Sequence, residues 1–158
     1  MTPAARSLDL VRSAQCATLA TLARDPAGYP FGSLVAVAAD ARGRPLLLLS
    51  KLAEHTQNLL ARAEASLLFC SEVPAGDDPL AAGRVTVLGR CEPVPAAERD
   101  DTRALFLARH PNATAYVDFA DFAFYRLEPE ALRWVGGFGR MTWVTADDYR
   151  AAAAAPSP

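Results

Sequence analysis

Histidine and cysteine are both scarce in this chain, which has two histidines and three cysteines among 158 residues. His55 and His110 lie far apart, and neither a His-x-x-x-His nor a Cys-x-x-Cys spacing occurs, which argues against a zinc-type site. Cys16, Cys70 and Cys91 are odd in number and widely spaced, which argues against a disulfide framework. Because all three cysteines stand among apolar neighbours, we expect them to be small core residues of a protein in a reducing compartment.

Long apolar runs and an excess of one charge are also missing. The longest apolar stretch is far shorter than a membrane span, and the N-terminus lacks the apolar segment of a secretory signal. With 16 Lys and Arg against 18 Asp and Glu, the formal net charge is −2, and no concentrated basic face is present for nucleic-acid binding. We therefore expect a cytoplasmic protein that binds neither nucleic acid nor membranes. Its high alanine, arginine and proline content is typical of a GC-rich bacterial genome.

The sequence is rich instead in short apolar segments that are typical of strands. Apolar residues make up 51% of the chain, enough to fill one sizeable core. Helical segments fall between these strands without the regular alternation that a parallel sheet requires. We therefore predict a single domain, residues 1–158, of the mainly β class with peripheral α-helices, built as a small antiparallel barrel of six or seven strands. Residues 1–6 and 151–158 are expected to fray.

Patterns in the first part of the chain place several elements. A helix is predicted over residues 7–14, with Ser7 as its N-cap. Residues 31–38 are typical of a strong strand, and the turn at 40–43 predicts that it pairs antiparallel with residues 45–50. Since the run at 45–50 is continuously apolar until its last residue, we expect a strand buried on both faces.

The second part of the chain alternates more clearly between apolar and polar residues. The longest alternating segment, residues 84–94, is interrupted by Gly89, a predicted bulge or bend. Two separate strands are predicted at 121–127 and 131–135.

The most informative local feature is the junction between the run at 45–50 and the helical pattern that follows. Ser50 and Lys51 end the run, and hydroxyl, amide and basic groups gather where the helix begins. The first N–H groups of a helix are unpaired and carry partial positive charge, so this junction can seat an anion such as phosphate. The alternative is an ordinary helix start whose polar groups bind water. His55 is either a surface residue of this helix or a hydrogen-bond donor to a ligand.

Other residues with reactive or aromatic side chains give weaker signals. Ser33 and Ser50 have no Gly-x-Ser-x-Gly context, so a nucleophilic serine is not indicated. The Gly-Gly-Phe-Gly segment at 136–139 lies between strands and does not open a helix, unlike a dinucleotide-binding loop. Trp134 and Trp143 are expected to be core residues at the rim of the barrel rather than stacking platforms for a cofactor.

Four motifs stand out in chain order: Leu-Ala-Glu-His-Thr-Gln-Asn-Leu at 52–59, Arg-Val-Thr-Val-Leu-Gly at 84–89, Asp-Phe-Ala-Phe-Tyr-Arg at 121–126 and Val-Gly-Gly-Phe-Gly-Arg at 135–140. With Tyr-Pro-Phe-Gly-Ser-Leu-Val at 29–35, they resemble the FMN-binding split-barrel proteins related to pyridoxamine 5′-phosphate oxidase. The branch they resemble most is that of the HugZ-like haem-utilisation proteins. The resemblance spans residues 14–144, and its most specific piece is the first motif.

This resemblance implies a six-stranded antiparallel split β-barrel that forms a homodimer, with FMN in each of two clefts at the subunit interface. It implies an FMN-dependent oxidoreductase acting on an unknown small-molecule substrate, in which the flavin carries the redox chemistry. The implied cofactor-binding residues of one subunit are Ser33, Leu34, Val35, Leu49, Ser50, His55, Thr56, Gln57 and Asn58. Those implied for the other subunit are Arg84, Val85, Gly137, Phe138 and Arg140.

Two departures from the family pattern concern the choice of cofactor. Ser33 and Gln57 stand where oxidases of this family carry basic residues, so the phosphate seat is less cationic. No histidine follows His110, whereas HugZ-like haem degraders use a histidine in a C-terminal extension.

Other occupants of the same fold therefore remain as alternatives to FMN. One is haem, in a haem-binding protein with Arg84, His55 or Asp121 near the site. A second is the deazaflavin F420. A third alternative is a cofactor-free split barrel that serves only as an interaction dimer.

Overall fold

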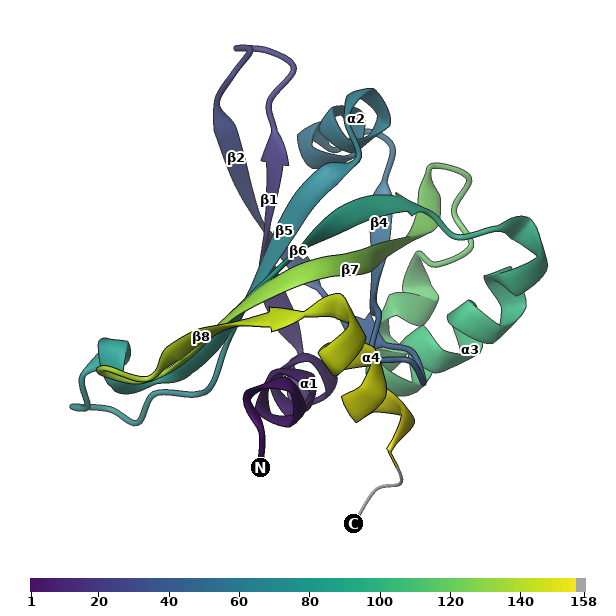
Figure 1. Ribbon diagram of the computed structural model, residues 1–158. Coiled ribbons are helices and arrows are strands. Elements are labelled where there is room, and N and C mark those ends of the chain that lie inside the picture. Colours follow the sequence, from purple (N-terminus) through teal and green to yellow (C-terminus); the bar gives the residue numbers. More distant parts are fainter. Residues whose placement is uncertain (156–158) are drawn as a thin grey trace.

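The computed structural model (Figure 1) describes residues 1–155 as one curled antiparallel sheet with helices packed around it. The strands are β1 (Cys16–Leu22), β2 (Pro30–Ala36), β3 (Ala38–Ala39), β4 (Pro45–Ser50), β5 (Glu64–Cys70), β6 (Gly83–Pro93), β7 (Phe122–Gly136) and β8 (Met141–Thr145). The helices are α1 (Pro3–Ser13), α2 (Glu54–Ala61), α3 (Arg99–Arg109) and α4 (Ala146–Ala154), with short 3₁₀ helices η1 (Pro79–Ala81), η2 (Ala96–Glu98) and η3 (Pro111–Ala115). No helix within residues 1–155 is long and apolar enough to cross a membrane.

The order of the strands makes this sheet a split barrel. Neighbouring strands run antiparallel in the order β2-β1-β5-β6-β7-β4-β3, and β8 adds to β7. β2 and β3 stand at opposite ends of this order, yet only Val37 separates them in the sequence, so the sheet curls until its two ends meet. β2 pairs only with β1, and no strand pairing joins β2 to β4. The predicted mainly β class is confirmed, although the described residues form eight strands rather than six or seven.

Two hydrophobic clusters hold the elements together. The larger lies inside the barrel and includes the fully buried Leu19, Leu67 and Val87. The smaller packs α3 and η3 against the sheet through residues such as Phe106. Successive side chains of a strand point to opposite faces, and β4 therefore supplies Leu47 to the first cluster and its neighbour Leu46 to the second. The expectation that this strand is buried on both faces is confirmed.

Both ends of the chain contain more helix than the sequence pattern predicted. α1 begins at Pro3 rather than Ser7, because Thr2 caps it by accepting a hydrogen bond from the N–H of Ala5 at 3.2 Å, and proline suits the first helical turn. α4 continues to Ala154, since alanine is the strongest helix former and the helix packs on α1. Residues 3–6 and 151–154 are thus helical, and fraying of the two ends stays a prediction. Residues 156–158 lie outside the described part of the chain.

β7 is one continuous strand where two were predicted. The predicted bulge is confirmed: the register with β6 shifts between Leu88 and Gly89, and Gly89 lies opposite Pro129. Proline cannot donate a ladder hydrogen bond, and the bulge is the place where a strand tolerates that loss. A Cβ on Gly89 would lie 2.0 Å from the carbonyl oxygen of Glu128, so the close approach of the two strands requires glycine there.

The predicted hairpin between residues 31–38 and 45–50 forms only at its base. β2 pairs with β1 along its whole length, and only Ala38 and Ala39 of β3 pair with β4. The cause is a change of direction at Val37, whose side chain is fully buried in the barrel core. As a result, most of β2 runs away from β4 (Figure 1), which opens the barrel on that side.

Candidate functional site

The opening between β2 and β4 holds a cleft of about 340 Å³, which is our candidate ligand site. Its walls come from β2, β4, the turn that leads into α2, and the segment from η3 to the start of β7. The lining residues are Leu34, Val35, Ala36, Leu48, Leu49, Ser50, Ala53, His55, Tyr116 and Phe122. The cleft thus brings together Leu34, Val35, Leu49, Ser50 and His55, five of the residues that the sequence resemblance implied for one subunit.

His55 is the lining residue with the most useful chemistry. It lies in the first turn of α2 and is half-buried. Burial lowers the pKa of its imidazole below the ordinary value of 6.5, because desolvation disfavours the charged form. The ring is therefore neutral at neutral pH, which is the form that binds a metal ion through a nitrogen lone pair.

The polar groups at the junction of β4 and α2 are paired with Asp121. The Ser50 hydroxyl donates to a carboxylate oxygen of Asp121 at 2.7 Å and accepts from the backbone N–H of Leu52 at 3.1 Å. The backbone N–H of Lys51 donates to the carbonyl oxygen of Asp121, also at 2.7 Å. The Ser50 hydroxyl and the amides of Lys51 and Leu52 are therefore engaged within the chain, whereas no side chain among the described residues caps the start of α2 at Glu54.

Three further residues implied as phosphate or flavin ligands also point to internal roles. Thr56 and Asn58 are fully buried, and the Thr56 hydroxyl forms no hydrogen bond with the part of the chain that the structure describes. The Gln57 amide donates to the carbonyl oxygen of Lys51 at 2.7 Å. Contact of Thr56 or Asn58 with a cofactor would require rearrangement at the start of α2, and the role of all three side chains in binding stays a prediction.

Asn58 has a clear structural role, since it ties α2 to the hairpin of β1 and β2. Its amide donates to the Thr21 hydroxyl at 3.1 Å and accepts from the backbone N–H of Arg24 at 3.0 Å.

Replacing Asn58 with leucine should lower the free energy of unfolding by about 2–3 kcal/mol, because the buried Thr21 hydroxyl and the backbone N–H of Arg24 lose their partner. Urea denaturation measures this change. As a control, Asn112→Leu on the exposed side of η3 should change the unfolding free energy by less than about 0.5 kcal/mol. Equal, small effects of both substitutions would contradict the structural role assigned to Asn58.

One wall of the cleft is aromatic, and the sequence reasoning missed it. The ring centroid of Phe122 lies 5.0 Å from that of Tyr116 and 6.4 Å from that of Phe119. Such a cluster can pack against a flat, conjugated ligand. The available signal was the density of aromatic residues between 116 and 125, which at the level of sequence indicates an apolar face that favours dimerisation rather than a ligand wall.

Ser33, Arg84 and Val85, which the resemblance also implied as cofactor ligands, do not line this cleft. Ser33 lies on β2, outside the lining set. Val85 is fully buried inside the barrel, and the Arg84 guanidinium donates to the carbonyl oxygens of Leu80 at 3.1 Å and Ala82 at 3.3 Å. Arg84 therefore fixes η1 against the start of β6 within its own chain.

Gly137, Phe138 and Arg140 form the turn between β7 and β8, at the end of the sheet remote from α2 (Figure 1). Gly137 has φ +98°, and a Cβ there would come within 3.0 Å of the carbonyl oxygen of Ala81, so the turn is held close to η1. Phe138 is 70% exposed. Since this group was expected to reach the cofactor from a second subunit, its contribution stays a prediction.

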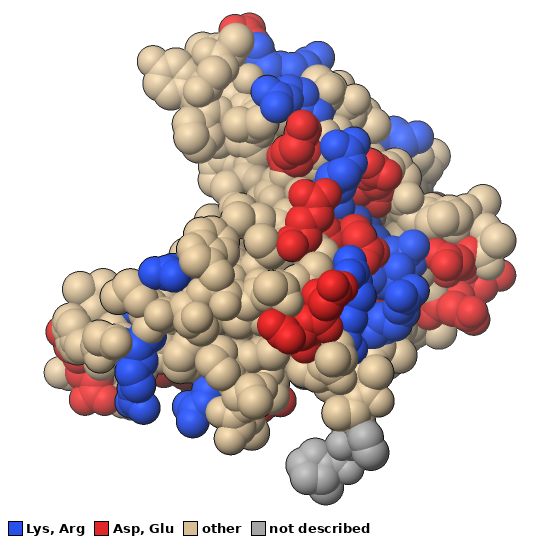
Figure 2. All heavy atoms as spheres, in the orientation of Figure 1, with Lys and Arg blue, Asp and Glu red and all other residues tan. Residues whose placement is uncertain are grey.

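The sheet face turned away from the barrel core, here called the outer face, carries few charges in two of its rows, whereas another row contains Glu64, Arg90 and Glu128. Residues directly opposite one another across six strands form one row of this face: Leu34, Thr18, Leu68, Thr86, Arg133 and Trp143. A parallel row contains Cys70, Arg84, Val135 and Met141. Both charged members of these two rows are basic. Figure 2 shows a hollow, mostly uncharged surface between the β1–β2 hairpin and the end of the sheet that carries β8.

The outer face corrects three expectations about the core. Cys16 and Cys70 are exposed rather than buried, because their strands turn them outward. Trp143 is 59% exposed, with the Arg133 guanidinium 5.5 Å from its ring centre. Sequence neighbours show that a residue lies in a strand, but not which face of the strand is covered. Cys91 is buried as expected, and burial raises the pKa of its thiol to about 12.

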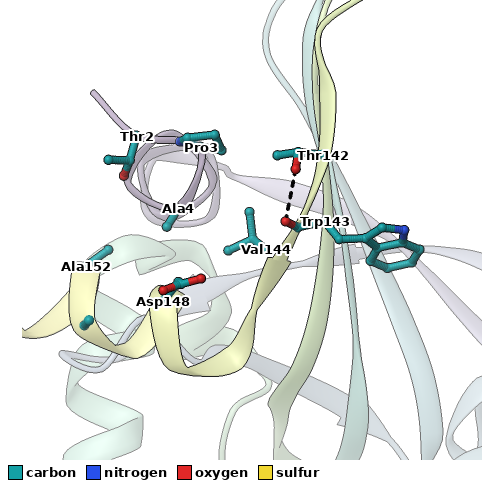
Figure 3. A pocket seen from close by; sticks show the side chains of 9 residues that line it. Thr2, Pro3, Ala4, Thr142, Trp143, Val144, Asp148 and Ala152 are labelled. Carbon is teal, nitrogen blue, oxygen red and sulfur yellow. Dashed lines mark hydrogen bonds between the residues drawn. The ribbon is translucent and has the colours of Figure 1, made fainter.

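A larger cavity of about 410 Å³ lies between α1, β8 and α4. In Figure 3 the side chains of Thr142 and Val144 face this space, whereas the Trp143 ring points away from it. Its other polar side chains serve as helix caps or cap partners: Thr2 caps α1, and Asp148 accepts a hydrogen bond from the Thr145 hydroxyl at 2.8 Å. None of the implied cofactor ligands lines it.

An antiparallel barrel split between β2 and β4, with a cleft at the split, defines the class of FMN-binding-type split-barrel proteins. A family model described as "CREG, beta-barrel" matches residues 2–151, and the chain belongs to this family. The fold is shared with a putative pyridoxamine 5′-phosphate oxidase from Listeria innocua, with a TM-score of 0.65 over 86% of this chain and all of the other, although only 12% of residues are identical. The predicted relationship to this superfamily is confirmed.

Two more similar proteins have names that refer to haem. The chain is 41% identical over 122 residues to "Non-canonical heme oxygenase HOZ, chloroplastic" of Arabidopsis thaliana, covering 77% of this chain and 36% of that one. A solved structure of a heme binding protein from Mycobacterium smegmatis has 35% identity and a TM-score of 0.85, covering 96% of this chain and 61% of the other. The chain therefore spans only part of each of these proteins. These relatives support the haem-utilisation side of the resemblance.

Proposed function

We propose that this chain is a haem-binding split-barrel domain, with haem held in the cleft between β2 and β4. The observation that carries the proposal is a neutral histidine, His55, at the edge of a cleft with aliphatic and aromatic walls. Histidine is a common axial ligand of haem iron. The names of the HOZ and mycobacterial relatives support the same ligand.

The residues present fit haem in chemical character. His55 would supply a nitrogen ligand, while Leu34, Val35 and Phe122 would pack against the apolar faces of the macrocycle. Bound haem supplies an iron centre, whose redox and oxygen chemistry belongs to the cofactor. The domain contributes the ligand, the orientation of the ring and the exclusion of water.

FMN, the cofactor first expected, is less well supported. The HOZ and mycobacterial relatives have haem in their names. Of the groups expected to hold the phosphate, Ser50 is bonded to Asp121, and Thr56 and Asn58 are buried in the fold. An FMN-dependent oxidoreductase therefore stays an untested alternative.

The resemblance implied a homodimer, and we further propose that two copies of the chain associate through the outer face. Ligand cavities generally have volumes of about 300–1,000 Å³, and this cleft lies at the small end of that range, as expected if part of its wall comes from a second copy. Leu34, at the edge of the cleft, is 77% exposed. Leu34 belongs to the same row as Leu68 and Trp143 on the outer face. A second copy seated on that face would cover exposed apolar side chains and extend the wall of the cleft.

Titration of the purified protein with haem, FMN and F420, followed by visible absorption, tests the proposed ligand. We expect a Soret band that saturates at one haem per chain, with weak or undetectable binding of FMN and F420. Saturable FMN or F420 binding without a Soret shift would overturn the proposal. Indifference to all three ligands would favour the cofactor-free interaction dimer.

The lowered pKa of His55 predicts how haem binding depends on pH. A proton competes with iron for the imidazole, so affinity should stay constant from pH 8 to pH 6.5 and fall only below the lowered pKa, by about tenfold per pH unit. Haem titrations at half-unit steps of pH measure this dependence. A decline that is already under way above pH 6.5 would contradict the role assigned to the buried ring.

A further inference from the structure

We propose that Asp121 makes this cleft reject phosphorylated cofactors, because its carboxylate holds the Ser50 hydroxyl and places a negative charge where a phosphate would bind. The inference rests on the proposed function only in taking the cleft between β2 and β4 as the ligand site. It holds whether or not haem is the natural occupant.

The hydrogen bonds around Asp121 carry the argument. One carboxylate oxygen accepts the Ser50 hydroxyl at 2.7 Å, and the backbone carbonyl accepts the N–H of Lys51 at the same distance. Ser50 in turn accepts the N–H of Leu52 at 3.1 Å. An anion that used the Ser50 hydroxyl would have to displace the Asp121 carboxylate, and the amides of Lys51 and Leu52 are already bonded to other acceptors.

The charges near this junction point in the same direction. Asp121 and Glu54 are acidic and Lys51 is the basic residue of the turn, while burial keeps His55 neutral. The local balance is one positive charge against two negative ones. A phosphate placed here would meet a like charge at hydrogen-bonding distance from Ser50, and such repulsion is an effective way to exclude a ligand.

FMN and riboflavin differ only by the phosphate, so the pair isolates its contribution. We expect the wild-type chain to bind FMN no more tightly than riboflavin in a flavin-fluorescence titration. Asp121→Asn removes the charge, and its amide oxygen is a weaker acceptor for the Ser50 hydroxyl than the carboxylate. This variant should bind FMN at least about tenfold more tightly than wild type, with riboflavin affinity unchanged. Inorganic phosphate should raise the melting temperature of the variant but not that of wild type.

Glu54→Gln is the matched control, since Glu54 is an exposed acid in the first turn of the same helix. It removes one charge nearby without touching Ser50. Asp121→Ser serves as a second variant if the asparagine form does not fold, as judged by circular dichroism.

Several results would overturn the inference. One is that the wild-type chain binds FMN about tenfold more tightly than riboflavin. Another is that a folded Asp121 variant shows no gain in FMN affinity. The third is that Glu54→Gln gains as much FMN affinity as the Asp121 variant. Haem titration of the wild-type protein is scored separately. Failure of haem binding would remove the proposed function and leave the comparison of FMN with riboflavin intact.

Discussion

Replacing His55 with alanine is expected to abolish the Soret band of the haem-loaded protein at micromolar concentrations. The substitution removes the proposed iron ligand. Loss of groups that merely support a metal ligand costs about 10–100-fold in affinity, so loss of the ligand itself should cost at least about a hundredfold. Haem titration monitored by visible absorption gives the dissociation constant. His55 is half-buried at the surface of α2, so the variant should fold normally.

The other histidine provides the control for this experiment. The ring of His110 is hydrogen-bonded to the carbonyl oxygen of Val37 at 2.7 Å and does not line the cleft. His110→Gln should therefore retain the Soret band. Tyrosine can also hold haem iron, and Tyr116 lines the same cleft. If His55→Ala bound haem with wild-type affinity and Tyr116→Phe lost haem binding, the iron ligand would be Tyr116 rather than His55. That result would contradict our account.

Replacing Leu68 with arginine is expected to convert a dimer into a monomer. Leu68 lies in the middle of the outer-face row, between Thr18 of β1 and Thr86 of β6. The charged members of the two outer-face rows, Arg84 and Arg133, are already basic, so a third positive charge on each copy would add repulsion to the loss of apolar contact. Central interface residues can contribute 2 kcal/mol or more, and we expect the dimer dissociation constant to rise at least about thirtyfold.

Sedimentation equilibrium over a range of concentrations measures that dissociation constant. Leu60→Arg is the control, because Leu60 is 58% exposed on α2 and lies outside the outer-face rows. It should leave the mass unchanged. A wild-type chain that is monomeric at micromolar concentration, or a Leu68→Arg variant that stays dimeric, would contradict association through the outer face.

The positions of the strands could be predicted because alternation and short apolar runs mark them directly. Which face of each strand is covered could not be predicted, since that depends on the layer packed against it. Trp143 and Cys16 illustrate the difference: both lie on strands as expected, and both face outward. The continuity of β7 was missed for another reason. Pro129 is normally a strand breaker, and only the bulge at Gly89, on a different strand, makes it acceptable there.

The candidate site could be predicted in outline but not in its chemistry. The residues at 34–35 and 49–55 could be brought together from the resemblance, and the structure places five of them around one cleft. The pairing of Ser50 with Asp121 spans 71 residues of sequence, so no local pattern could reveal that the Ser50 hydroxyl is already bonded to a carboxylate. The aromatic wall was missed for the same reason, because Tyr116 lies near Ser50 only through the fold.

The most direct test of our account is the position of iron in crystals of the haem-loaded protein, located by anomalous diffraction at the iron absorption edge. The account predicts one iron peak per chain in the cleft between β2 and β4, within bonding distance of a nitrogen of His55. Iron bound anywhere else, or a haem-treated crystal with no iron in that cleft, would contradict it.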